Sequence, residues 1–209
     1  MDLYLFDFDK TLHAYDFRMR LPTLSVVTGA SQYHLAKTRW AGGYEVRVVA
    51  GEWRTSAECL EEFERVTRSR HTLENWQETR ALASTVIPAN VDTLPRESTL
   101  GIVSVPSDNP SPGAEALPRL APDVTAIVGE NRLVSCRGEV RKPDSRIFKL
   151  ADAHDGARAE DTFFVDDSAS NLEGARAPGI HTHQLSYRMG VPQNDALDDA
   201  ITRFAGRGD

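Results

Sequence analysis

Residues Leu3–Phe6 are apolar at every position, and two carboxylates, Asp7 and Asp9, follow them directly. A run that is apolar throughout is typical of a strand covered on both faces, as in the centre of a parallel α/β sheet. Side chains two positions apart in extended backbone project to one side, about 6–7 Å from each other. Ligands of such sheets bind at the carboxyl ends of the strands. The stretch therefore predicts a central strand whose end presents two carboxylates at a spacing that suits a phosphoryl group.

Taken alone, this pattern has a second interpretation. Asp9 or Thr11 could cap the element that follows the strand, since short polar side chains of this kind are common in turns and at helix starts. A choice between the two depends on residues further along the chain.

Composition limits the classes of function. The chain has 209 residues, enough for one core with a sizeable insertion, and a formal net charge of −7 with a pI near 5.4. No basic stripe is available to neutralise the phosphates of a nucleic acid. No run approaches the length of a membrane span. Two cysteines in no metal-ligand spacing, and a core strand with no signal peptide before it, favour a cytoplasmic protein.

The region from 14 to 87 is expected to be mainly helical. Apolar residues recur at helical spacing in Glu58–Arg70, with Thr55 or Ser56 as the cap, and a second amphipathic helix covers Leu73–Leu82. The apolar run Leu24–Val27 is compatible with a strand or with part of a helix, because periodicity does not separate the two over four residues.

Strands and helices alternate in the rest of the chain. Further buried strands are predicted at Leu100–Val105, Thr162–Val165 and Ile180–Leu185, with shorter candidates at Ala126–Val128 and Leu133–Val134. Helices are predicted at Pro88–Leu94 (stopped by Pro95), Ala114–Leu117 (within a proline-rich loop spanning 106–122), Ser145–Ala153, Asn171–Ala177 and Ala196–Phe204. This alternation predicts a doubly wound, mostly parallel α/β sheet.

Four features at strand ends or in loops occur in a fixed order: Asp7 with Asp9, then Ser104, then Lys142, then Asp166 with Asp167. In that order they resemble the motifs of the haloacid dehalogenase (HAD) superfamily, and the segments around Lys142 and Asp166 are similar to those of members with a helical cap inserted after the first motif. The resemblance implies a Rossmann-like core made of residues 1–13 and 88–209, and a small helical cap domain made of residues 14–87.

The two first carboxylates have separate expected roles. Asp7 as nucleophile would form an aspartyl-phosphate, which splits one difficult displacement into two easier ones. Asp9 would protonate the leaving oxygen and later deprotonate water, general acid–base catalysis worth about 10²–10⁴-fold. Carboxylates packed this densely repel each other, so a cation must offset them, and Mg²⁺ prefers such oxygen ligands.

The resemblance implies the remaining assignments. The Mg²⁺ ligands would be the Asp7 carboxylate, the Asp9 main-chain carbonyl and Asp167, with Asp166 acting through a bound water. Lys142 would neutralise the nucleophile and the phosphate together, and the Ser104 hydroxyl would donate to a phosphate oxygen.

We therefore expect a Mg²⁺-dependent phosphomonoester hydrolase that acts on a small phosphorylated metabolite. Two alternatives stay open: a phosphomutase with the same residues, and a non-catalytic member that binds a phosphorylated ligand or a protein. Three departures bear on activity, namely Lys10 where many relatives have glycine, Val105 where close sugar-phosphatase relatives have asparagine, and the proline-rich stretch 106–122. Neither the substrate nor the oligomeric state follows from the sequence.

Overall fold

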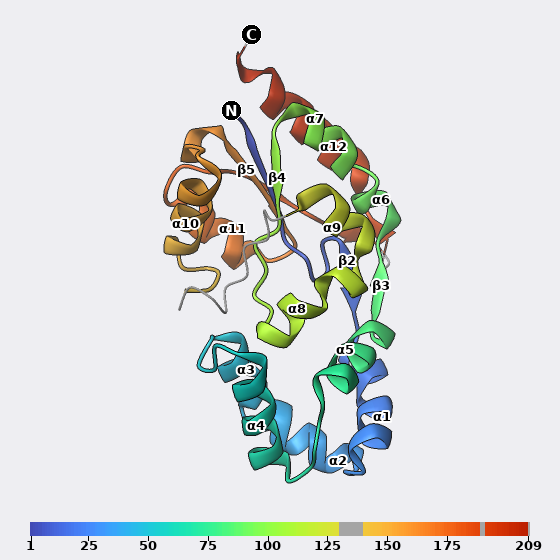
Figure 1. The fold of residues 1–209 in the computed structure, drawn as a ribbon. Helices are drawn as coiled ribbons and strands as arrows, with labels where there is room; N and C mark the ends of the chain where they lie inside the picture. The colour runs from blue at the N-terminus through green and yellow to red at the C-terminus, as the bar shows by residue number, and fades with distance from the viewer. Residues whose placement is uncertain (130–139, 189–190, 209) are drawn as a thin grey trace.

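The computed structural model describes residues 1–129, 140–188 and 191–208. Within them, four parallel strands form a sheet in the order β4-β1-β5-β6 (Figure 1). The strands are β1 (Leu3–Phe6), β4 (Ile102–Ser104), β5 (Thr162–Asp166) and β6 (His181–Gln184). The predicted α/β architecture with a parallel sheet is thereby confirmed, and the predicted strand at Leu133–Val134 lies outside the described residues.

Strand β1 lies in the interior of the sheet, and its four side chains are fully buried. Successive side chains of a strand point to opposite faces. Tyr4 and Phe6 accordingly belong to one hydrophobic cluster, and Leu3 and Leu5 to the other. Helices cover both faces, with α10 and α11 on one side and α7, α9 and α12 on the other (Figure 1). This two-sided cover is the reason why the run is apolar at every position.

The helices around the sheet differ in part from the prediction. They are α6 (Pro88–Val91), α7 (Leu94–Leu100), α8 (Ser111–Leu120), α9 (Pro122–Val128), α10 (Arg146–Asp155), α11 (Ala169–Arg176) and α12 (Asn194–Ala205), with short 3-10 turns at Ala159–Asp161 and Gly206–Gly208. Pro95 was expected to stop a helix, but it lies in the first turn of α7. Proline is tolerated there because the backbone N–H groups of the first turn have no acceptor within the helix. Residues Ala126–Val128, predicted as a strand, belong to α9.

Residues 17–82, called the helical segment below, contain no strand among their described elements. The elements are α1 (Phe17–Thr28), α2 (Gln32–Leu35), a π-helical turn (Ala36–Ala41), α3 (Tyr44–Val49), α4 (Ser56–Thr67) and α5 (Leu73–Leu82). The run Leu24–Val27 is part of α1. Thr55 caps α4 with a complete capping box, as its position before Glu58 predicts. The segment has its own apolar cluster, which includes Leu24, Leu35 and Phe63.

Two short antiparallel strands join the helical segment to the sheet. They are β2 (His13–Tyr15) and β3 (Ser84–Val86), which pair with each other at the two ends of the segment. In Figure 1 the helical segment lies below the sheet, on the side toward which β1 runs, and α8 lies between them. A further hairpin pairs β7 (Tyr187–Arg188) with β8 (Val191–Pro192). Among the described residues, no helix has both the length and the apolar character needed to cross a membrane.

Candidate active site at the edge of the sheet

The parallel sheet brings chain-distant residues to one edge. Asp7 follows β1 directly, Asp166 is the last residue of β5, and the Asp7 N–H donates to the Val165 carbonyl at 3.0 Å. Ser104 is the last residue of β4 and is fully buried. It is paired in register with Leu5 of the neighbouring strand β1, and Leu5 lies two residues before Asp7. The strand ends predicted to meet therefore do meet.

Lys142 reaches this edge from the loop before α10. Its buried ammonium contacts the Asp7 carboxylate and lies 3.1 Å from Asp166 Oδ2. It also donates to the Pro106 carbonyl at 3.2 Å, and its backbone N–H donates to Asp108 Oδ1 at 3.1 Å. Three partners hold the ammonium between the two carboxylates, and Asp108 holds the backbone of the lysine.

A glycine in α11 allows Lys142 to be held there. A Cβ atom built on Gly174 would lie only 1.9 Å from the carbonyl oxygen of Pro143, the residue after Lys142. Only a residue without a side chain permits this approach of helix and loop. Gly174 therefore fixes the position of the loop that carries the lysine.

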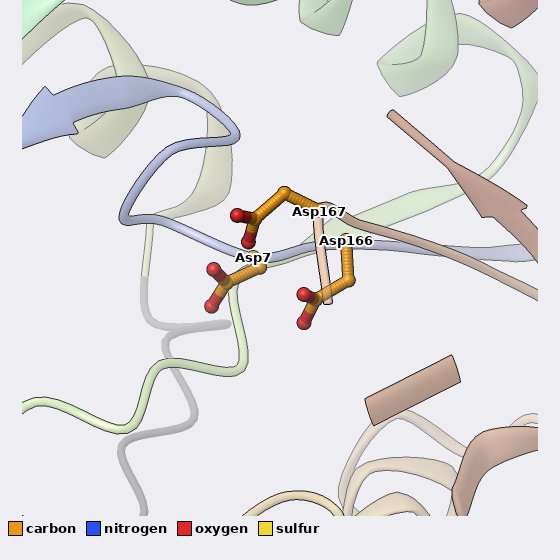
Figure 2. Close-up of side chains that lie close together, drawn as sticks. All are labelled: Asp7, Asp166 and Asp167. Atoms are coloured by element: carbon orange, nitrogen blue, oxygen red, sulfur yellow. The ribbon is translucent and has the colours of Figure 1, made fainter. Parts of the chain in front are cut away.

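Three carboxylates form a group that could hold a metal ion. One oxygen each of Asp7, Asp166 and Asp167 lies within 4.8 Å of the others, and Figure 2 shows the three side chains together at the end of the sheet. Carboxylate oxygens are the ligands that Mg²⁺ prefers. The trio brings three potential negative charges against the one ammonium of Lys142, so its donor set and its charge both fit a divalent cation.

The electrostatics of the site agree with this fit. Burial raises the pKa of Asp7 from 3.8 to about 7, against the opposing effect of the Lys142 charge, and Asp166 adds to the rise. Burial likewise raises the pKa of Asp167. Although burial alone would lower the pKa of Lys142, Asp7 and Asp166 raise it, so the lysine is charged. Burial, and to a smaller extent the charge of Asp166, thus disfavours the ionised forms of Asp7 and Asp167, and a bound cation would favour them.

Asp166 differs from its two neighbours because its oxygens are already engaged. Oδ1 accepts from the Ser168 N–H at 2.8 Å, and Oδ2 accepts from Asn171 Nδ2 at 2.9 Å as well as from Lys142. Its side chain is fully buried, whereas that of Asp167 is partly exposed. Asp167 is therefore the more accessible ligand of the pair.

Asp9 lies outside the carboxylate trio and is held by residues that the sequence patterns did not identify. The guanidinium of Arg80, from α5 of the helical segment, forms an ion pair with the Asp9 carboxylate. Asn109 Nδ2 donates to the other oxygen at 3.3 Å from the loop after β4. In the sequence, Arg80 stands at a position of the helical pattern of Leu73–Leu82 where an apolar residue is expected. A charged residue at such a position is the one sequence signal that could have indicated a buried ion pair.

Lys10 adopts the conformation that favours glycine. Its φ is +62°, in the left-handed region, which explains why glycine is common at this place in the resembling family. Its side chain is largely exposed, and Nζ lies 3.9 Å from Asp167 Oδ2. The Lys10 carbonyl accepts a hydrogen bond from the Tyr187 hydroxyl. A cation thus stands beside one of the three clustered carboxylates.

No protein-family model matches the chain, and no curated protein matches its sequence. Solved structures do resemble it. A predicted HAD-like family hydrolase from Porphyromonas gingivalis is 18% identical with a TM-score of 0.74, over 99% of this chain and 98% of that one. A HAD family enzyme from Bacteroides thetaiotaomicron, in complex with magnesium and inorganic phosphate, is 17% identical with a TM-score of 0.73, over 89% and 94%. A HAD phosphatase from Thermococcus onnurineus is 20% identical with a TM-score of 0.63, over 89% and 86%.

These comparisons establish the fold. The chain has the HAD fold, as the order of its motifs indicates. A dehalogenase and a putative β-phosphoglucomutase share that fold, so the fold alone does not select the reaction. The choice of reaction depends on the residues at the sheet edge.

Proposed function

We propose that the protein is a Mg²⁺-dependent phosphomonoester hydrolase that acts on a small phosphorylated metabolite through an aspartyl-phosphate on Asp7. The observation that carries the proposal is the position of the Lys142 ammonium between Asp7 and Asp166, with Asp167 completing a group of carboxylates at the same strand ends. A binding protein has no need of a buried nucleophile held next to a lysine, and a phosphate ester needs cations on both sides of its oxygens.

Asp7 is the nucleophile in this proposal. Its carboxylate attacks phosphorus, a bond from Asp7 oxygen to phosphorus forms, and the bond from phosphorus to the leaving oxygen breaks. Lys142 favours the ionised form of Asp7, because its charge opposes the rise in pKa that burial causes. Lys142 also lies where it can neutralise the transferred phosphoryl oxygens, and the Ser104 hydroxyl is the proposed donor to one of them.

Asp9 is the proposed general acid and base. It gives its proton to the leaving oxygen in the first step, and it takes a proton from the water that attacks the phospho-enzyme in the second. Phosphate leaves and the Asp7 carboxylate is regenerated. The helical segment is the proposed cap. It contacts the rest of the chain at two places: Arg80 of α5 pairs with Asp9, and the Ser56 hydroxyl donates to Glu115 of α8 at 2.5 Å. Such closure keeps bulk water from the phosphoryl group.

The residues proposed to hold Mg²⁺ are Asp7 and Asp167 through their carboxylates and Asp9 through its main-chain carbonyl, with Asp166 acting through water. The oxygens of Asp166 already accept bonds from three protein groups, which supports its indirect role. When bound, the ion supplies positive charge to the phosphate oxygens and offsets the clustered carboxylates.

A hydrolysis assay tests this function. Phosphate release from p-nitrophenyl phosphate and from a panel of phosphorylated metabolites is measured at fixed Mg²⁺, with EDTA, and with the Asp7→Asn variant. We expect Mg²⁺-dependent release that EDTA abolishes and that Asp7→Asn lowers by at least about 10⁴-fold. No release above the Asp7→Asn background would support a binding protein instead. Recovery of the phosphoryl group in an isomeric ester, rather than as free phosphate, would indicate a phosphomutase.

A further inference from the structure

Three arginines of the helical segment are almost completely buried. Arg20 of α1, Arg39 of the π-helical turn and Arg80 of α5 are 1%, 1% and 2% exposed. Arginine is rarely this buried unless an opposite charge accompanies it. We call these three residues the arginine cluster. Their partners therefore decide whether the cluster is complete.

The cluster has more positive than negative charge. Arg39 Nε donates to Glu45 Oε2 at 2.7 Å, and Arg80 pairs with Asp9. Arg20 donates to neutral acceptors, the Thr79 hydroxyl at 3.3 Å and the Trp76 carbonyl at 3.2 Å, and its guanidinium carbon lies 4.5 Å from the centroid of the Trp76 ring. Within the described residues no carboxylate forms an ion pair with Arg20. One buried guanidinium in three thus has no anion of its own.

Neighbouring groups respond to this excess charge. Burial and the charge of Arg39 lower the pKa of Arg20 to about 10. Burial together with the charges of Arg20 and Arg39 lowers the pKa of His71 to about 3. Burial would raise the pKa of Glu45, but Arg39, Arg20 and Arg80 lower it below its usual value. Since Glu45 responds to all three arginines, the cluster acts on one common region.

The region also has an unused donor and access to solvent. Arg39 Nη1 is buried and has no hydrogen-bond partner within the described part of the chain. A buried donor that is left unpaired is costly, which favours an acceptor that arrives from outside. Glu45 and Asp9 are 24% and 33% exposed, so each arginine pair borders on solvent. The acidic partners of Arg39 and Arg80 are thus the side of the cluster that faces solvent.

We infer that the arginine cluster is a subsite for an anionic group, a carboxylate or a second phosphoryl group, carried by the leaving group of the substrate. This inference rests on the proposed function, because Asp9 is the group that protonates the leaving oxygen there. Arg80 forms an ion pair with Asp9, and its charge also lowers the pKa of Glu45, the ion-pair partner of Arg39. The leaving group, placed next to Asp9, consequently extends toward Arg39 and Arg20. The substrate is a phosphate monoester whose alcohol is itself an anion.

Matched pairs of esters test the inference. Phosphoglycolate is compared with ethyl phosphate, and phosphooxybutyrate with butyl phosphate, for the carboxylate at two distances. Propanediol bisphosphate is compared with propyl phosphate for the second phosphoryl group. We expect kcat/KM to favour the anionic member of at least one pair by about 10- to 100-fold, the range for charged hydrogen bonds in a buried site. The pair with the largest ratio of kcat/KM identifies whether the anionic group is a carboxylate or a second phosphoryl group.

Variants of the cluster provide the second arm. Arg39→Met and Arg20→Met are expected to reduce that ratio by about tenfold or more, mainly through KM, and Arg39→Lys to restore part of it. Arg65→Met is the matched control, because Arg65 is a surface arginine of the same segment, paired with Glu62 outside the cluster. Its ratio should equal that of the wild type.

The outcomes separate two failures. If no ester is hydrolysed, the proposed function fails and the subsite fails with it. If esters are hydrolysed but the wild type prefers no anionic ester over its neutral partner, the proposed subsite is wrong and the proposed function stands. This outcome is measured on the wild type and does not depend on the folding of any variant. A preference that survives both Arg39→Met and Arg20→Met also overturns the proposed subsite, and would leave the cluster a structural role in the helical segment.

Discussion

The sheet edge and the helical segment both bury charge, but with opposite signs. At the edge, Asp7 and Asp166 contact the buried ammonium of Lys142, and the carboxylate of Asp167 lies beside them with the exposed ammonium of Lys10 at 3.9 Å. In the segment, three guanidinium groups share two carboxylates, those of Glu45 and Asp9. The edge therefore fits a cation, whereas the segment fits an anion. Asp9 connects the two charged regions, since it follows β1 and pairs with Arg80 of α5.

This difference divides the expected effects of mutation. Residues of the edge should determine the rate for every substrate alike, because each ester presents the same phosphoryl group there. Residues of the arginine cluster should determine which ester is preferred. Variants of the edge and variants of the cluster should therefore differ in how they change the ratio of kcat/KM between anionic and neutral esters.

Lys142→Met should lower kcat/KM by about 10³-fold on every ester, with the ratio between anionic and neutral esters unchanged. The variant leaves Asp7 and Asp166 buried without their shared cation, so the free energy of unfolding should also fall by about 3–5 kcal/mol. Steady-state kinetics and urea denaturation measure the two effects. A changed ratio between the esters would contradict the division.

Gly174→Ala should lower kcat by about 10- to 100-fold. The added methyl would meet the Pro143 carbonyl at 1.9 Å, and the loop that carries Lys142 must then move away from Asp7. Gly206→Ala is the control, because a methyl group there has no atom within 4 Å. Equal activity of the two variants would show that the position of the loop is unimportant for catalysis.

The Mg²⁺ concentration for half-maximal activity should fall by roughly tenfold between pH 6 and pH 8 and level off above. The direction follows from Asp7, whose pKa is raised to about 7 in the metal-free protein, so that below this pH a proton occupies a carboxylate that the metal needs. The raised pKa of Asp167 acts in the same direction. Mg²⁺ titrations of the hydrolysis rate at several pH values measure it, and a half-maximal concentration independent of pH would contradict the assignment of these ligands.

Lys10→Gly should lower the half-maximal Mg²⁺ concentration by only about 2- to 5-fold, because the removed cation is largely exposed and solvent screens it. Lys10→Gln removes the charge and keeps the left-handed backbone strain, so it separates the two contributions. Lys10→Arg keeps the charge and should resemble the wild type. If Lys10→Gln also resembles the wild type, the charge beside Asp167 has no effect on the metal.

The sheet and the residues at its edge were predictable because their signals are local. Leu3–Phe6 shows by its composition alone that both faces are covered, and parallel strands necessarily end at one edge, so Asp7 and Asp166 could be placed together across the chain. Lys142, 135 residues after Asp7, was found because its order among the motifs resembles a known family.

The helical segment was predictable as helices but not as a binding surface. Arg80 pairs with Asp9 across 71 residues, and nothing in the sequence around either residue requires that pair. Arg20 and Arg39 read as ordinary surface arginines until the packing of α1 against α5 and of the π-helical turn against α4 buries them. Pro95 was misjudged for a related reason, since whether a proline ends or begins a helix depends on the chain around it.

The most direct test of the account is the covalent state of Asp7 during turnover. Protein is mixed with p-nitrophenyl phosphate and Mg²⁺, and the reaction is quenched in acid within milliseconds. The protein is then digested, and the mass of the peptide that contains Asp7 is measured by mass spectrometry. We use Asp9→Asn, in which the second step should be slow and the phospho-enzyme should accumulate. We expect one added phosphoryl group on Asp7, lost on treatment with hydroxylamine. Release of nitrophenol with Asp7 unmodified at every time point would contradict it.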